Sequence, residues 1–164
     1  MLRDKNLIPL SHQHQRALAL CVRIDRAQPI ADIDLEAWQA EVAQLFEQEI
    51  KIHFAAEEDE IFLPAREFHE LETLVDELIA EHRSLRESFR QAESRSMSGE
   101  SLVAFAQQLS AHIRKEERLL FERIQQLMNA DELEALGMRL ESALRNAGTS
   151  CAMPNETTKL RPQS

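Results

Sequence analysis

One ten-residue pattern occurs twice in this chain of 164 residues, at residues 53–62 and again at residues 112–121. Both copies read His-x-x-x-Glu-Glu-x-x-apolar-Phe, and both lie in segments rich in good helix formers. Residues four apart are neighbours on one face of a helix, so each copy places an imidazole beside a carboxylate. Two such faces turned toward each other would offer nitrogen and oxygen ligands that suit a pair of transition-metal ions. The repeat therefore predicts two helices that face each other across a metal site.

Apolar residues recur with a helical period in four long segments, which are separated by short breakers. These segments cover residues 10–27, 35–64, 68–93 and 100–128. A shorter fifth helix is expected to start at a capping box formed by Asn129 and Glu132 and to end near Gly148. No segment alternates apolar and polar residues in the manner of a strand. We therefore predict an all-α, up-down-up-down four-helix bundle with a short C-terminal fifth helix over residues 1–148, and a disordered tail over residues 149–164.

Charge and composition limit the partners that such a domain can have. The formal net charge of −10 argues against binding to nucleic acid or to an anionic membrane, because those partners require clustered positive charge. No run approaches the roughly 18 apolar residues of a membrane span, and the N-terminus lacks the features of a signal peptide. Of the two cysteines, Cys21 lies in the first helix and Cys151 in the tail, and nothing in their spacing calls for a disulfide. A cytoplasmic protein is expected.

The phase of each helix predicts which polar residues face the core. The histidine and first glutamate of each motif fall in the middle of the apolar stripe of their helix, and the first and third helices each add one inward histidine. The six candidate metal ligands are His14, His53, Glu57, His82, His112 and Glu116. Burying such groups without partners would cost about 1–3 kcal/mol for each, against a net stability of about 5–15 kcal/mol. Metal ions would satisfy the nitrogens and neutralise the carboxylates.

Other polar residues near these positions are expected to take no part in the site. The residues expected to face solvent or connecting segments are His12, His69, Glu58 and Glu117. Glu49 and Asp25 could either orient a ligand or cap the edge of the core, and the edge is favoured. Cys21 lies on the inward face, where a small buried cysteine is expected to serve packing rather than redox chemistry.

The order of the candidate ligands resembles that of the hemerythrin-like (HHE cation-binding) domains. The order is His14, His53-x-x-x-Glu57, His82 and His112-x-x-x-Glu116, and it is flanked by Pro9-Leu10-Ser11, by Phe62-Leu63-Pro64 and by Glu81. The resemblance covers roughly residues 7–128. It implies a non-haem centre of two iron ions, oxo- or hydroxo-bridged, in which Glu57 and Glu116 bridge and the four histidines bind terminally.

One departure from the family pattern bears on function. Oxygen-carrying hemerythrins have a second histidine one turn away on the third helix, and this chain has Leu78 or Arg86 at the corresponding offsets. With four histidines, an iron position would be left to water, hydroxide or a substrate. This makes reversible oxygen storage less favoured and leaves room for sensing, scavenging or redox chemistry.

Three function classes therefore follow from the sequence. The leading hypothesis is a cytoplasmic di-iron protein that binds oxygen, nitric oxide or peroxide at an open iron site, in sensing, scavenging or stress response. The alternative is an iron-handling or iron–sulfur repair protein that stores or donates iron. The third is a metal-free helical interaction module. Iron follows from the resemblance alone, because mixed imidazole and carboxylate ligands also accept manganese or zinc, and the sequence does not decide whether the protein is an enzyme.

Overall fold

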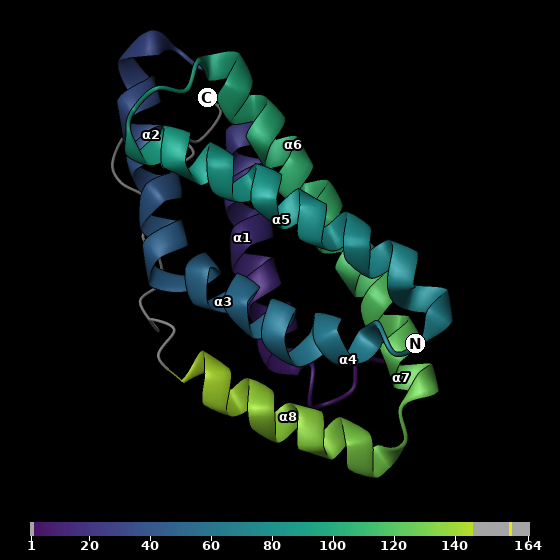
Figure 1. The fold of residues 1–164 in the computed structure, drawn as a ribbon. Helices are drawn as coiled ribbons and strands as arrows, with labels where there is room; N and C mark the ends of the chain where they lie inside the picture. Colours follow the sequence, from purple (N-terminus) through teal and green to yellow (C-terminus); the bar gives the residue numbers. More distant parts are fainter. Residues whose placement is uncertain (1, 146–157, 159–164) are drawn as a thin grey trace.

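A computed structural model describes residues 2–145 and residue 158 (Figure 1). Within these residues every regular element is a helix, which confirms the all-α class. Five helical runs follow one another along the described chain, three of them simple: α1 (Ile8–Arg26), α5 (Glu72–Glu93) and α8 (Ala130–Leu144). No helix of the described residues is long and apolar enough to cross a membrane. The predicted tail, with Cys151, lies outside the described residues apart from Thr158.

Three π-helical turns interrupt the other two runs. The second run comprises α2 (Asp32–Leu45), the π turn η1 (Phe46–Ile50), α3 (Lys51–Ala56), the π turn η2 (Glu57–Phe62) and α4 (Leu63–Ala65). The fourth run comprises α6 (Gly99–Lys115), the π turn η4 (Glu116–Leu120) and α7 (Phe121–Leu127). Turns of this kind are rare in proteins, but those that occur are frequently found at functional sites. Two of them begin at Glu57 and Glu116, so the backbone departs from α geometry at the glutamates of the repeated motif.

The four long runs begin and end within three residues of their predicted bounds, except at the start of α5. There Phe68 takes an extended backbone with φ −89° and ψ 106°, and a 3₁₀ turn, η3 (His69–Leu71), precedes the helix. The third helix therefore starts at Glu72 rather than near Phe68. The last helix is described as far as Leu144, and its predicted end near Gly148 lies outside the described residues.

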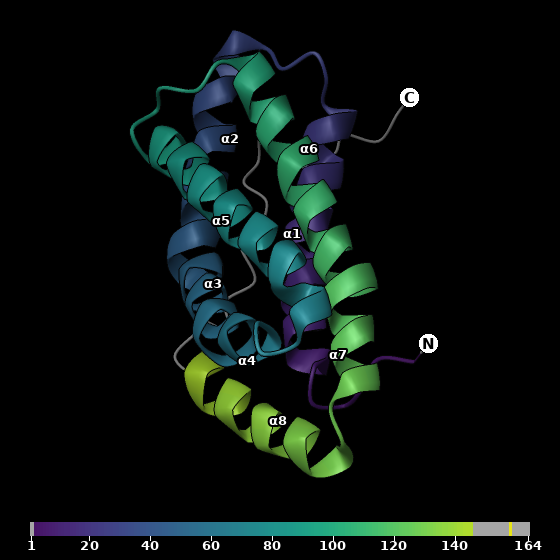
Figure 2. The same cartoon turned by 45° about the vertical axis from the view of Figure 1, so that its right-hand side comes forward.

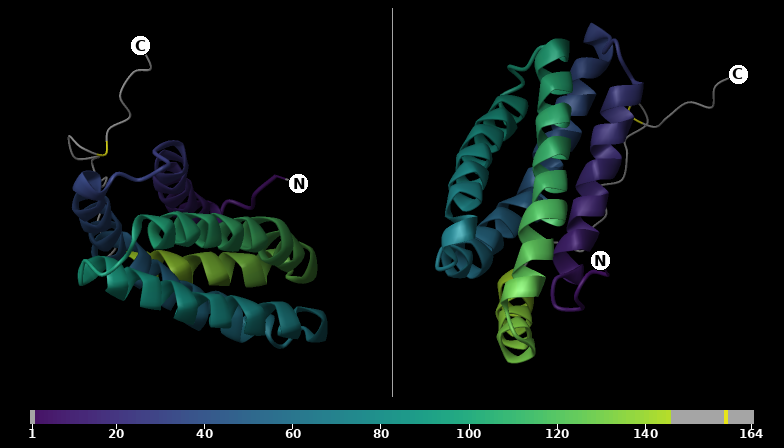
Figure 3. Two further views of the ribbon diagram at one scale, coloured as in Figure 1. Left: turned by 90° about the horizontal axis from the view of Figure 1, so that it is seen from above. Right: turned by 90° about the vertical axis from the view of Figure 1, so that its right-hand side faces the viewer.

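The long runs pack lengthwise as a helical bundle. α1 lies against α6, and α2 lies against α5, as Figures 2 and 3 show from three further directions. α8 lies across one end of the bundle, against α3 and the η2 turn (Figures 1 and 2). The segment before α1 is held beside α7, where Arg3 Nη1 donates a hydrogen bond of 3.0 Å to Gln125 Oε1. The middle of the bundle is thus enclosed by helices that are distant in sequence.

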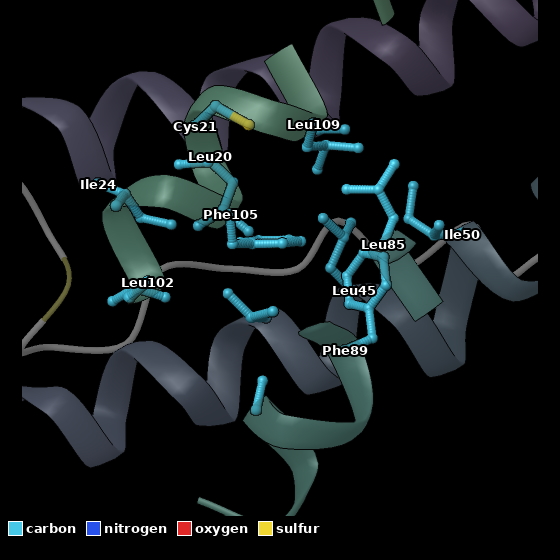
Figure 4. Packing of buried hydrophobic residues seen from close by; sticks show 14 of the residues in the cluster. Leu20, Cys21, Ile24, Leu45, Ile50, Leu85, Phe89, Leu102, Phe105 and Leu109 are labelled. Carbon is cyan, nitrogen blue, oxygen red and sulfur yellow. The ribbon is translucent and has the colours of Figure 1, made fainter. Parts of the chain in front are cut away.

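Two apolar clusters fill the bundle on either side of its middle. The first contains Trp38, Phe54, Phe89 and Phe105, and part of it is drawn in Figure 4. The second contains Phe62, Leu78, Phe121 and Leu136. Cys21 is buried in the first cluster, as expected from its phase on α1, and its thiol is free. Aromatic residues from both clusters contact histidines that lie between them, so the polar centre described below is enclosed by apolar packing.

The N-terminus of α8 is fixed by the predicted capping box. Asn129 Oδ1 accepts a hydrogen bond of 3.0 Å from the backbone N–H of Glu132, and Glu132 Oε2 accepts one of 2.8 Å from the backbone N–H of Asn129. Replacing Asn129 with alanine is expected to lower the free energy of unfolding by about 1 kcal/mol, as measured by urea denaturation. Asn129→Asp keeps an acceptor oxygen and is expected to retain the stability. An Asn129→Ala variant as stable as the wild-type protein would show that the cap contributes nothing to stability.

Candidate metal centre

Six polar side chains converge in the middle of the bundle. They are His14 from α1, His53 from α3, Glu57 from η2, His82 from α5, His112 from α6 and Glu116 from η4. Each of these residues is at most 2% exposed. The structure therefore brings together, at one level of the bundle, all six residues that the sequence predicts as ligands.

These side chains form two groups that share the same pair of glutamates. One group, here called the His14–His53 position, contains those two histidines with Glu57 and Glu116, and the other, the His82–His112 position, contains the remaining two histidines with the same glutamates. Within each group the potential ligand atoms lie within 4.8 Å of one another. The result is two adjacent candidate cation positions, each with two nitrogens, that have the same two carboxylates in common.

The two carboxylates each direct one oxygen to each position. Glu57 Oε1 lies 3.1 Å from His53 Nε2, and its other oxygen lies 3.5 Å from His82 Nε2. Glu116 Oε2 lies 3.2 Å from His14 Nε2, and its Oε1 lies 3.1 Å from His112 Nε2. A carboxylate placed in this way can bind one cation through each oxygen.

Each imidazole is oriented by a hydrogen bond at its outer nitrogen. The Nδ1 partners are Glu117 for His14 (2.7 Å), Gln13 for His53 (2.6 Å), Glu58 for His82 (2.8 Å) and Glu81 for His112 (2.7 Å). Carboxylate and amide oxygens accept hydrogen bonds, so each Nδ1 donates. In a neutral ring the lone pair of Nε2 then faces the centre, which is the arrangement that metal-binding histidines adopt.

The prediction that Glu58 and Glu117 face solvent is wrong. Their side chains are 30% and 24% exposed, and each bonds a histidine on another helix. Their helical phase places them on the flank of the run, where a glutamate is long enough to reach the neighbouring helix. Nothing in the sequence predicts a role for Gln13, and only the family resemblance points to Glu81. All four residues adjoin a candidate ligand in sequence, and this was the one available signal.

The predictions for His12, His69 and Glu49 are confirmed. His12 is exposed, and the side chain of His69 is fully exposed. Asp25 is also exposed and accepts a hydrogen bond from the side chain of Gln28, so it does not orient a ligand. Glu49 is buried and forms an ion pair of 2.9 Å with Arg16, whose side chain is 41% exposed. This pair lies at the edge of the core, where Glu49 was expected.

The shared carboxylates control the charge of the imidazoles. Burial lowers the pKa of His82, but the carboxylates of Glu116 and Glu57 outweigh this effect and raise the pKa to about 10. Burial also lowers the pKa of His112, and Glu116 is the main cause of its net rise to about 9. The pKa of His14 lies well above its usual value for the same reasons, with Glu116 the largest favourable contribution. Without a metal these imidazoles hold protons at neutral pH.

The carboxylates are shifted in the opposite direction. Burial and the charge of Glu116 raise the pKa of Glu57, but the imidazoles of His53 and His14 outweigh both and hold that pKa below its usual range. Burial likewise raises the pKa of Glu116, and the positive charge near it, from His112 first, lowers it well below the usual range. Ionised carboxylates and protonated imidazoles thus balance one another, and a metal ion would have to displace the protons.

Hydrogen bonding does not satisfy the atoms at the centre. Among the described residues, both oxygens of Glu57 and of Glu116 and the Nε2 atoms of His82 and His112 are buried without a hydrogen-bond partner. The Nε2 atoms of His14 and His53 lie 3.0 Å apart, where the protonated ring of His14 can donate a hydrogen bond to His53. Each unsatisfied buried group costs about 1–3 kcal/mol. Two cations would remove all of these penalties, so the residues present fit a pair of metal ions.

Comparison with known families agrees with this donor set. The family model of the hemerythrin HHE cation-binding domain matches residues 9–124, a range that includes all six side chains of the centre. The chain belongs to the hemerythrin family. Comparisons with curated proteins and with solved structures gave no significant match. Family membership makes this a cation-binding domain, and iron is the metal that the family implies.

In this hemerythrin-family protein, the position of the additional histidine found in oxygen carriers is not filled by a ligand. Leu78 is fully buried in the second apolar cluster. Arg86 Nη1 donates a hydrogen bond of 2.7 Å to Glu58 Oε1, and its guanidinium lies 5.4 Å from the ring centre of Phe54. The centre therefore has four histidines, two at each position, as the sequence indicated.

Aromatic rings from both apolar clusters pack directly on the histidines. Phe54 stacks on His82 with ring centres 3.8 Å apart, and Phe62 lies 5.2 Å from the same ring. Phe121 stacks on His14 at 5.7 Å, with the planes 12° apart. These contacts fix the planes of the imidazoles and keep water from their faces.

Proposed function

We propose that this hemerythrin-family protein holds two iron ions, one at the His14–His53 position and one at the His82–His112 position. Glu57 and Glu116 would bridge the ions, and the four histidines would bind terminally. The observation that carries this proposal is the orientation of the two carboxylates. Each of them directs one oxygen to one pair of histidines and its other oxygen to the other pair. We assign the four long runs the up-down-up-down order in which such bundles place metal sites between facing helices.

We further propose that the protein binds a small ligand at this centre, namely oxygen, nitric oxide or peroxide. Two imidazoles and two carboxylate oxygens do not complete an octahedral ion, so each position keeps room for another ligand. Bound iron supplies affinity for such molecules and the capacity for electron transfer. Sensing or scavenging during oxidative or nitrosative stress is the role that this chemistry favours.

The residues around the centre suit a small apolar or weakly polar ligand. Phe62 is buried 5.2 Å from the ring of His82, Phe54 covers one face of the same ring, and Leu78 is fully buried one turn before His82 on α5. These side chains exclude water. The Nδ1 hydrogen bonds keep the four Nε2 atoms aimed at the centre, so little rearrangement is needed on binding.

Iron analysis and absorption spectroscopy test this proposal. Protein purified without added metal is expected to contain two irons per chain, and the reduced protein is expected to gain an absorption band when exposed to air or to nitric oxide. His82→Ala is expected to lose one of the two irons, because it removes a terminal ligand. His69→Ala is the matched control, since its side chain is fully exposed. Fewer than two irons would contradict the two-ion site, and two irons without any spectral response would contradict ligand binding.

A further inference from the structure

The outer partners of the four histidines are not equivalent. Three imidazoles donate from Nδ1 to a carboxylate: His14 to Glu117, His82 to Glu58 and His112 to Glu81. His53 donates instead to the side-chain amide oxygen of Gln13, at 2.6 Å. Gln13 is 7% exposed, so His53 has a neutral, buried partner where the other three histidines have a carboxylate.

The three carboxylates are also held in place from outside. Arg3 Nη2 donates to Glu117 Oε2 at 2.6 Å, and Arg86 Nη1 donates to Glu58 Oε1 at 2.7 Å. Glu81 is paired with Lys115. Each of these positively charged side chains keeps its carboxylate ionised and fixed in position. A similar carboxylate partner therefore serves three of the histidines, and the fourth has a neutral one.

This difference changes the donor strength of the rings. A carboxylate that accepts the Nδ1 hydrogen raises the basicity of Nε2 and so strengthens its bond to a metal. Hydrogen bonds to a charged acceptor are roughly twice as strong as those between neutral groups. His53, bonded to an amide, is therefore the weakest nitrogen donor of the four. The His82–His112 position has two strong donors, whereas the His14–His53 position has one.

We infer that Gln13 makes the His14–His53 position the weaker and more exchangeable of the two metal positions. This inference rests on the proposed two-ion centre. The His82–His112 ion binds first and leaves last, while the His14–His53 ion is lost and replaced more readily. Gln13 is a positioning residue in this role, because it acts on the ion through the ring of His53.

Zinc binding measured by competition with a chromophoric chelator tests the inference without any enzymatic activity, because mixed nitrogen and oxygen sites accept zinc. The metal-free wild-type protein is expected to bind two zinc ions with dissociation constants that differ by about 10–100-fold, the usual effect of an outer partner. Gln13→Glu is expected to lower the larger dissociation constant, which belongs to the His14–His53 position, so that the two constants become similar. Glu81→Gln is expected to lower the affinity of the His82–His112 position by about 10–100-fold. The two histidines of each position would then have one carboxylate and one amide as their Nδ1 partners.

Matched controls separate these effects from a general change of charge. Gln15→Glu makes the same substitution at an exposed residue of α1, and Glu87→Gln does so on α5 at a side chain that is 52% exposed. Both controls are expected to leave the two constants unchanged. Glu81→Gln adds no buried charge, so it keeps the test decisive if Gln13→Glu does not fold.

Three results would overturn the inference. Two zinc ions bound with equal constants in the wild type would show that the positions do not differ. Two unequal constants that Glu81→Gln leaves unaltered would show that the difference does not come from the outer partners. Binding of fewer than two ions would instead remove the two-ion centre itself, and the proposed function would fail with it.

Discussion

Replacing Glu57 with glutamine is expected to empty both metal positions together. One oxygen of Glu57 faces His53 at 3.1 Å and the other faces His82 at 3.5 Å, so a single side chain serves both ions. An amide has one acceptor oxygen and no charge. Changes to outer partners already cost about 10–100-fold in affinity, so the loss of a direct bridging ligand is expected to cost more than about 100-fold for each ion. Metal content after gel filtration, and chelator competition, measure the effect.

Asp59→Asn is the matched control for this variant. Asp59 lies on the same π turn, is exposed, and has the same charge, so its replacement is expected to leave two ions bound. Glu116→Gln is expected to behave like Glu57→Gln, because Glu116 also directs one oxygen to each position. If Glu57→Gln lost a single ion and kept the other at full affinity, Glu57 would be a terminal ligand of one position, and the shared centre would be wrong.

The helices and the convergence of the six side chains could be predicted because both depend on local pattern. The spacing of His53 and Glu57 fixes them on one face of a helix whatever the rest of the chain does. An apolar stripe around those residues then places that face in the core. The capping box at Asn129 was equally local, and its two hydrogen bonds are present.

The outer partners could not be predicted in the same way. Helical phase gives the direction of Glu58 relative to its own helix, but not which helix lies beside that flank. Only the packed structure shows that His82 and Arg86 of α5 are within its reach. The π turns that begin at Glu57 and Glu116 were also missed, because a count of 100° per residue assumes an uninterrupted α-helix.

Removing the metal is expected to destabilise the protein, and more so as the pH rises. Free metal at 100 times its dissociation constant stabilises the folded state by about 2.7 kcal/mol, which corresponds to a rise in Tm of roughly 5–10 °C in a domain of this size. In the metal-free protein, His82 and His112 have pKa values raised from 6.5 to about 10 and about 9. The stability that they contribute is complete below pH 6.5 and is lost as the pH rises through those values.

The loaded protein is not expected to show this loss, because a metal-bound Nε2 carries no proton. The difference in Tm between loaded and chelator-treated protein should therefore widen between pH 7 and pH 9, as measured by calorimetry at matched ionic strength. Metal addition at pH 7 should also release protons, which shows as a binding enthalpy that depends on the ionisation enthalpy of the buffer. A helical interaction module without a metal would give the same Tm before and after chelation at every pH. That result would remove the metal from the folded state, and with it the reason for burying four imidazoles and two carboxylates in one layer.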